Sequence, residues 1–159
     1  MIILGIDPGV AIVGYATLVF KQNKLSVVNY GCIKTPAGKD FSRRILQIYE
    51  EVSSLIKKCR PDVLAVESVF FAKNTKTAMK VSESRGVTIL AAAQNGLKIK
   101  EYTPLQVKQA ITGYGKASKD QIQKMVKAVL RLKEIPRPDD VADALAIAIT
   151  CSQTKEFHL

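Results

Sequence analysis

The chain has 159 residues, long enough for one domain over residues 1–159 with a substantial core and too short for two ordinary domains with a cleft between them. Hydrophobic residues make up 47% and aromatic residues 6%, with no Trp, so we expect a globular core of Ile, Val, Leu and Ala, and the composition excludes a disordered chain. Lys and Arg number 24 against 14 Asp and Glu, a formal net charge of +10 that suits either contact with phosphates or simple solubility.

The chain begins with three predicted strands. Residues 2–6 and 12–20 are rich in Ile, Val and Leu and flank a DPGVA turn, so they form adjacent strands of a hairpin. Residues 24–34 carry alternating apolar positions and end in a polar turn. A three-strand meander is the simplest arrangement of these segments.

A helix, a strand, a second helix and a further strand follow. Between Phe41 and Pro61, apolar residues recur every three or four positions, which predicts an amphipathic helix that the proline ends. Residues 62–67 form a short apolar run, typical of a strand covered on both faces. Residues 75–95 predict a helix despite an internal glycine, and residues 98–102 a short strand.

Three helices complete the chain. Residues 104–112 predict a short helix, and a Gly-rich loop leads to another at 118–132, for which Ser118 is the expected N-cap. The last helix begins after Pro138 and runs to about residue 152. The elements together predict an α/β fold in which helices flank a mixed five-stranded sheet.

Four acids stand at the ends of these core elements: Asp7 after the first strand, Glu67 after the fourth, and Asp140 and Asp143 at the start of the last helix. We call them the four acids. A carboxylate in such a place loses hydration and must be hydrogen-bonded, paired or neutralised by a cation. Asp140 and Asp143 lie about one helical turn apart, so they can share a cation. Oxygen ligands of this kind suit Mg²⁺ or Mn²⁺.

A purely structural explanation competes with the metal site. Acids favour helix N-termini because they cap free N–H groups and oppose the helix dipole, which accounts well for Asp139. An acid before a turn, such as Asp7, is also common. This explanation does not account for further acids that end strands at both Asp7 and Glu67.

The cysteine and histidine patterns argue against other kinds of site. Cys32, Cys59 and Cys151 are odd in number and widely spaced, which argues against a disulfide framework and a zinc site. The single His158 lies next to the C-terminus, so histidine-based catalysis is not expected. No apolar stretch approaches the roughly 20 residues of a membrane span, and we expect a cytoplasmic protein.

The segments ILGIDPGVAIVGYA, LAVESVFFAKN, QVKQAITGYGKASK and DDVADALAIAIT occur in the order found in RuvC-type Holliday-junction resolvases. The resemblance covers nearly the whole chain and implies an RNase H-like fold, with metal-binding catalytic roles for the four acids but not for Asp139. Some relatives place His at the position of Asp143. The implied enzyme is a Mg²⁺-dependent crossover junction endodeoxyribonuclease of recombination and repair. Two Mg²⁺ ions per active site, for which Mn²⁺ can substitute, would support in-line attack of water on a phosphodiester.

The resemblance also bears on DNA contacts. It places Lys108 and Lys119 near the scissile strand and Phe70 as a residue that stacks on a base, although neighbouring aromatic rings more often pack a loop against the core. Lys116 and Lys119 flank the Gly-rich loop at 113–115, where small residues permit close approach to phosphate.

Paired nicks in a two-fold junction call for two active sites related by a two-fold axis, so we expect a homodimer on four-way junction DNA. One face of the helix at 75–95 is the candidate interface, and its positions fit the core equally well: Met79, Ser82, Gly86 and Leu90. The resemblance further implies cooperation with a branch-migration motor of the RuvA and RuvB type.

Other functions compete with junction cleavage. IDPGVAIVGYA also resembles the first phosphate-binding turn of sugar-kinase and actin-like ATPases, but those enzymes need a second lobe for which this chain has no room. A nuclease acting on RNA–DNA hybrids uses the same kind of acidic centre. A catalytically silent DNA-binding module is the third alternative. Metal-dependent nicking of junction and hybrid substrates separates these cases.

Overall fold

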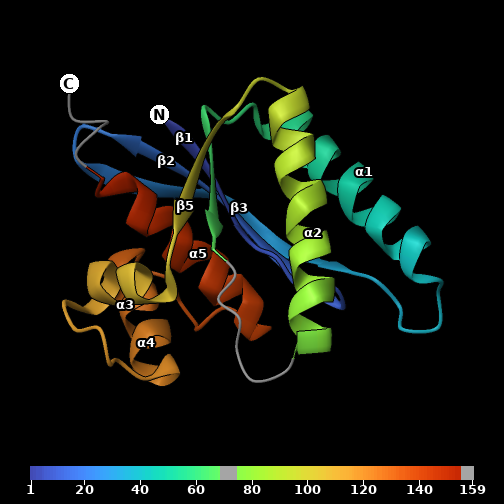
Figure 1. Ribbon diagram of the computed structural model, residues 1–159. Coiled ribbons are helices and arrows are strands. Elements are labelled where there is room, and N and C mark those ends of the chain that lie inside the picture. Colours follow the sequence, from blue (N-terminus) through green and yellow to red (C-terminus); the bar gives the residue numbers. More distant parts are fainter. Residues whose placement is uncertain (69–74, 155–159) are drawn as a thin grey trace.

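The computed structural model describes residues 1–68 and 75–154, except for the side chains of residues 75–77. Its centre is a five-stranded sheet in the order β3-β2-β1-β4-β5 (Figure 1). The strands are β1 (Ile2–Asp7), β2 (Ile12–Lys21), β3 (Lys24–Lys34), β4 (Val63–Glu67) and β5 (Lys98–Tyr102). The first three strands form an antiparallel meander, while β4 and β5 run parallel to β1. The predicted mixed sheet is therefore confirmed.

Five helices cover the sheet, and each was predicted to within a few residues. They are α1 (Phe41–Cys59), α2 (Thr75–Gln94), α3 (Pro104–Thr112), α4 (Lys119–Val129) and α5 (Asp139–Ser152). Helices α1 and α2 lie on one face of the sheet, and α3, α4 and α5 lie on the other (Figure 1). Ser118 caps α4 with a capping box, as expected.

The alternation of strand side chains divides the core into two layers. Ile3 belongs to the cluster under α3, α4 and α5, whereas its neighbour Leu4 belongs to the cluster under α1 and α2. The same alternation places Ala65 and Leu64 of β4 on opposite faces. A strand with helices on both sides needs apolar residues at successive positions, which explains the short apolar run of β4.

Helix α5 approaches the sheet closely because small residues face each other across the contact. A Cβ atom added at Gly5 would lie 2.4 Å from the carbonyl oxygen of Ala144 and 2.8 Å from the Cβ of Ala148. Nearly every α5 residue from Val141 to Ser152 is buried. The alanine-rich sequence of this helix therefore matches the glycine on the strand below it.

Helix α2 exposes two of its large apolar residues. The side chain of Leu90 is 49% exposed and that of Met79 is 59% exposed. The contact of α2 with the core instead uses small side chains, including Ser84, Thr88 and Ala91, all of which are buried. The core reading of Leu90 is therefore wrong, because small residues form the packed stripe of this helix.

The three cysteines are free thiols in the structure. Within residues 1–68 and 75–154, no helix combines the length and apolar character needed to span a bilayer.

The helix–sheet contact predicts opposite effects for two glycine substitutions. Gly5→Ala should destabilise the protein by about 1–3 kcal/mol or more, because the new methyl group overlaps the backbone of α5. Gly86→Ala is the matched control, since that exposed helical glycine has no atom within 4 Å of an added Cβ. It should leave stability unchanged or raise it by about 0.5–1 kcal/mol. Urea denaturation of both variants measures the difference, and a Gly5→Ala protein as stable as wild type would contradict the packing argument.

Candidate functional site

Two of the four acids lie side by side at one edge of the sheet. Asp7 is the last residue of β1 and Glu67 is the last residue of β4. These strands are parallel neighbours, with Ile6 paired to Val66 immediately before the acids. Parallel pairing therefore brings two carboxylates together from positions 60 residues apart in the chain.

Helix α5 brings the other two acids to the same edge. Asp7 of β1 is paired with Gly14 of the neighbouring strand β2. A Cβ atom added at Gly14 would lie 1.9 Å from the carbonyl oxygen of Asp140. The first turn of α5 thus rests directly on the strand beside Asp7, at a point where only glycine leaves room. Asp143 follows one turn later on the same helix.

The proximity of the four acids is visible in their electrostatics. The pKa of Asp7 is raised to about 8, first by burial and then by the charge of Asp143. Glu67 and Asp140 raise the pKa of Asp7 further. The pKa of Glu67 is raised to about 7, again by burial first and by Asp143 second. Each ionised acid therefore opposes ionisation of its neighbours.

The carboxylates are neighbours but do not form a closed cage. Among the residues that the structure describes, no three His, Cys, Asp or Glu side chains already lie close enough to coordinate one ion. The acids raise the pKa of Asp7, yet their oxygens are not close enough to coordinate one ion together. Both observations agree if the carboxylates face a common space without meeting in it. Their all-oxygen chemistry fits Mg²⁺, which usually binds one or two carboxylates and completes its shell with water and phosphate oxygens.

Lys119 occupies part of this space. Its Nζ lies 3.1 Å from Asp143 and 3.5 Å from Asp139. Desolvation lowers the pKa of Lys119, but the hydrogen bond and charge of Asp143, with those of Asp139, outweigh it and raise the pKa overall. The pKa of Asp143 is raised by burial despite this pairing. The ammonium group therefore compensates the cluster only in part.

Lys108 joins Lys119 at the mouth of the site. Together with Glu67 and Asp143 they line a pocket of about 240 Å³, which we call the Lys119 pocket. The charge of Lys108 also lowers the pKa of Glu67 against the effect of burial. Lys116 is exposed and does not line this pocket. The structure thus brings two of the three predicted DNA-binding lysines to the acids.

Asp139 behaves as a surface acid. Its carboxylate pairs with Arg137 and Lys119, and its side chain is 41% exposed. Desolvation acts to raise its pKa, but a hydrogen bond from Gln123 and the two cations lower it overall. Pro138 is the N-cap of α5, without a side-chain capping bond. Asp139 therefore lies in the first turn of α5, where an acid opposes the helix dipole, but it forms ion pairs and is not the N-cap.

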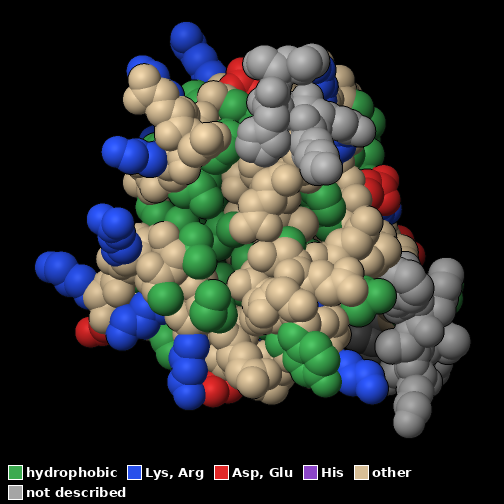
Figure 2. Space-filling view, turned by 90° about the vertical axis from the view of Figure 1, so that its left-hand side faces the viewer, with side chains coloured by type: hydrophobic (Ala, Val, Ile, Leu, Met, Phe, Trp, Pro, Cys, Tyr) green, Lys and Arg blue, Asp and Glu red, His purple; other side chains and the backbone are tan. Residues whose placement is uncertain are grey.

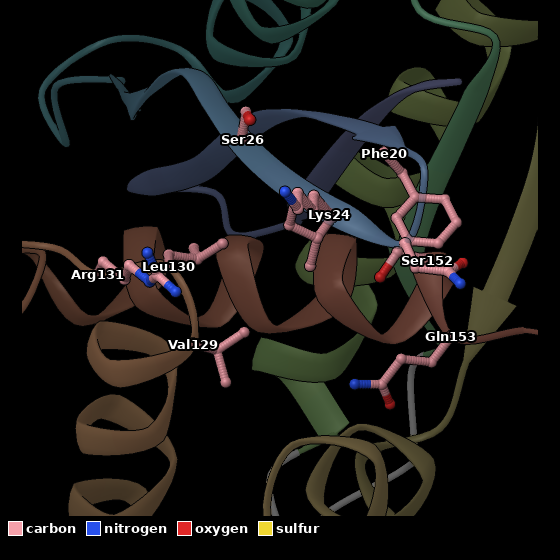
Figure 3. A pocket seen from close by; sticks show the side chains of 10 residues that line it. Phe20, Lys24, Ser26, Val129, Leu130, Arg131, Ser152 and Gln153 are labelled. Atoms are coloured by element: carbon pink, nitrogen blue, oxygen red, sulfur yellow. The ribbon is translucent and has the colours of Figure 1, made fainter.

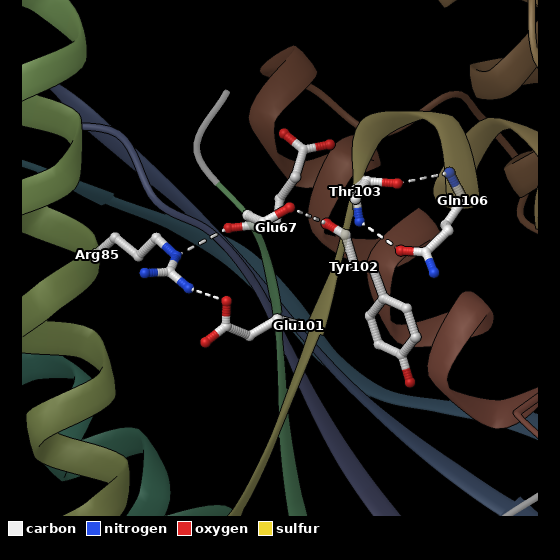
Figure 4. Close-up of polar contacts among 7 residues, drawn as sticks. Glu67, Arg85, Glu101, Tyr102, Thr103 and Gln106 are labelled. Atoms are coloured by element: carbon white, nitrogen blue, oxygen red, sulfur yellow. Dashed lines mark hydrogen bonds and ion pairs between the residues drawn. The ribbon is translucent and has the colours of Figure 1, made fainter. Parts of the chain in front are cut away.

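A third basic residue, which no sequence pattern predicted, lies beside Glu67. Arg85 of α2 donates through Nε to the backbone carbonyl of Glu67, at 3.1 Å, and pairs with Glu101 of β5 (Figure 4). The carboxylate of Glu67 points away from Arg85 (Figure 4). Arg85 therefore fixes the end of β4 without neutralising the acid. Only the fold brings these segments together, so no local motif was available to reveal the contact.

Phe70, the predicted stacking residue, is outside the described residues. A cavity of about 710 Å³ lies where the β2–β3 hairpin meets α4 and α5, and Phe20, Lys24 and Arg131 line it (Figure 3). Ser152 in its wall is about 18 Å along α5 from Asp140.

The face shown in Figure 2 carries many Lys and Arg side chains around its margin and few acids.

Comparison with known proteins identifies relatives over nearly the full length. Residues 3–151 match the family model described as crossover junction endodeoxyribonuclease RuvC. The protein of that name from Ruminiclostridium cellulolyticum is 57% identical over 149 residues, covering 94% of this chain and 90% of the relative. That of Clostridioides difficile is 52% identical over 158 residues, covering 99% and 94%. The structure of Thermus thermophilus RuvC in complex with Holliday junction substrate matches with a TM-score of 0.85 at 35% identity, covering 94% and 91%.

The raised pKa of Asp7 predicts how stability depends on pH without divalent cations. The folded state holds a proton up to about pH 8, whereas the ordinary pKa is 3.8, so stability falls as pH rises between these values. Asp7→Asn should remove this loss of stability. Its free energy of unfolding should exceed that of wild type by about 1–2 kcal/mol or more at pH 8 and differ little from it at pH 4. Thermal unfolding in EDTA at both pH values tests this. The exposed Asp40→Asn control should show no such trend, and an equal trend in both variants would contradict the argument.

Proposed function

This chain belongs to the RuvC family of crossover junction endodeoxyribonucleases, and we propose that the four acids form its active site. It is a Holliday junction resolvase, a phosphodiester hydrolase with an RNase H-like fold. The observation that supports the site assignment is the raised pKa of Asp7, because three other acids crowd this buried carboxylate. Such crowding is costly for folding and is explained by a function that uses it.

Mg²⁺ is the cofactor we propose, with Mn²⁺ as a substitute. When bound in a pair, the ions lower the pKa of the attacking water and stabilise the departing oxygen. The protein positions the ligands: β1 and β4 fix Asp7 and Glu67, while Gly14 allows α5 to deliver Asp140. Arg85 holds the carbonyl of Glu67 so that its carboxylate stays directed away from α2.

Lys119 is proposed to exchange partners when DNA binds. In the free protein its ammonium group is paired with Asp143. Compensation of that acid by divalent cations would release Lys119, which then stands beside Lys108 at the pocket mouth, ready to contact phosphate. Lys116, exposed on the loop between α3 and α4, would provide a more distant contact.

Family membership favours junction cleavage over the competing functions. The match over residues 3–151 argues against a sugar-kinase or actin-like ATPase and against a silent DNA-binding module. Activity on RNA–DNA hybrids is tested with the same preparation, because an acidic centre alone does not distinguish the two substrates.

A homodimer is part of the proposal. The outer face of α2 presents Met79 and Leu90, 59% and 49% exposed, beside the exposed Gly86, beyond which lies open space. Two large apolar side chains on one helix face, with a small residue between them, suit a self-complementary contact between two copies. We also propose that a branch-migration motor of the RuvA and RuvB type acts on the same junction.

The decisive experiment uses a synthetic four-way junction with and without Mg²⁺. Wild type should nick two strands symmetrically only with Mg²⁺, and more readily than it cleaves an RNA–DNA hybrid. Asp7→Asn should lower the single-turnover rate by at least about 10³-fold while binding the junction normally, because it removes ligand charge and no contact surface. Asp139→Asn is the matched control with near wild-type nicking. Full activity of Asp7→Asn would refute the site assignment.

The two lysines of the Lys119 pocket predict a change in salt dependence. The variant Lys108→Met with Lys119→Met should bind junctions of different sequence uniformly more weakly. The slope of log affinity against log salt concentration should fall by about 0.7–0.9 for each lost phosphate contact. Lys124→Met, an exposed lysine of α4 that pairs with Asp120, serves as the control. An unchanged slope in the double variant would remove both lysines from the DNA interface.

A further inference from the structure

A second basic pocket borders the four acids on the other side of the sheet. It has a volume of about 440 Å³, and the turn after β1 forms one wall. Its lining includes Arg44 of α1, Lys80 of α2 and, from the four acids, Asp140. The Lys119 pocket lies on the opposite side, between β4, α3, α4 and α5. Helices α1 and α2 cover one face of the sheet and α3, α4 and α5 the other (Figure 1). The two basic pockets border different members of the four acids, because Asp140 lines one pocket and Glu67 and Asp143 line the other.

Arg44 is held in place through Thr35 by the turn that follows Asp7. Its Nε donates to the hydroxyl oxygen of Thr35 at 2.9 Å, and that hydroxyl donates to the carbonyl of Val10. Thr35 is 3% exposed, and its backbone N–H donates to the carbonyl of Ala11. The guanidinium group is therefore tied through a buried hydroxyl to the first turn.

The terminal nitrogens of Arg44 remain available. Across residues 1–68 and 75–154, neither is hydrogen-bonded to a protein group, and no carboxylate pairs with them. A guanidinium fixed at Nε and free at both outer nitrogens presents the fork that binds a phosphate through two parallel bonds.

Lys80 places a second cation at the same pocket. Its Nζ lies over the face of the Phe41 ring, 5.7 Å from the ring centre, where the ring attracts a cation. It forms no ion pair with a carboxylate in the described part of the chain. Among the described residues that line the pocket, Asp140 is the sole acid, and in the enzyme that we propose its charge is taken up by the cofactor.

We propose that this Arg44 pocket binds a backbone phosphate of the junction strand on the side of the cleaved bond opposite Lys108 and Lys119. The strand would then cross the four acids with one phosphate contact on either side. A phosphate is favoured over a base because the pocket offers a planar fork and an ammonium group, whereas its turn wall is aliphatic and without an aromatic platform. The inference rests on the proposed active site and adds the path of the strand across it.

Methylphosphonate substitution of single phosphates tests the pocket directly. Junctions neutral at one position on either side of the nick are assayed for affinity and for single-turnover cleavage. Arg44→Met should weaken binding of the unmodified junction about tenfold and lower the salt slope by about one unit. At one flanking position, the neutral linkage should weaken junction binding by wild type to the same extent as the Arg44→Met substitution does. The same linkage should leave junction binding by Arg44→Met unchanged.

Controls separate this contact from folding and from the proposed function. Arg43→Met removes a neighbouring exposed charge outside the pocket lining and should keep the wild-type profile. Lys80→Met loses no hydrogen bond to the described residues, so it tests the pocket even if loss of the Thr35 contact destabilises the Arg44→Met protein. It should show the same changes in junction affinity and in sensitivity to the neutral linkage as Arg44→Met, but smaller ones. Identical phosphate profiles for wild type and both pocket variants would overturn the inference. Failure of wild type to nick in Mg²⁺ would instead refute the proposed function, while the affinity profile would still decide the pocket.

Discussion

The close contact between α5 and the sheet determines the geometry of this enzyme. Gly5 and Gly14 leave no room for a side chain, so the helix backbone lies against β1 and β2 where any larger residue would displace it. This contact builds the core, through the buried alanines of α5, and also delivers two acids to the end of β1. Packing and chemistry therefore depend on the same few glycines, because a helix displaced outward would carry Asp140 away from Asp7.

Assembly of the acids works against the stability of the fold that assembles them. Burial and mutual repulsion disfavour ionisation, as the raised pKa of both Asp7 and Glu67 shows. Lys119 relieves part of this repulsion through its ion pair with Asp143. A fully matched set of cations from the protein would remove the electrostatic reason for the proposed binding of Mg²⁺. Partial neutralisation of the acids by Lys119 limits the loss of stability and still leaves the site with an excess of negative charge.

Local sequence patterns predicted the elements and two of the acids well, because strand ends and helix starts are coded by nearby residues. The alternation of β1 and the apolar run of β4 place Asp7 and Glu67 at strand ends, and parallel pairing does the rest. Contacts made by tertiary structure were beyond such patterns. Leu90 looked internal because it is apolar, although α2 packs through smaller residues. Arg85 reaches the carbonyl of Glu67 from a helix 18 residues further on, a contact that leaves no trace in the sequence around either residue.

The net charge of +10 indicates affinity for nucleic acid but says nothing about where a strand is held. Lys and Arg side chains are spread over the surface, yet Lys108 and Lys119 line one pocket beside the acids, and Arg44 and Lys80 line the other. Scattered lysines attract DNA without fixing its position, whereas a guanidinium group tied to the turn after Asp7 has a defined relation to the acids. An order of positive, negative and positive charge across the sheet edge admits a strand in which flanking phosphates are bound and the middle one meets the acids. In the proposed strand path, contact with the flanking phosphates would set the register in which water attacks.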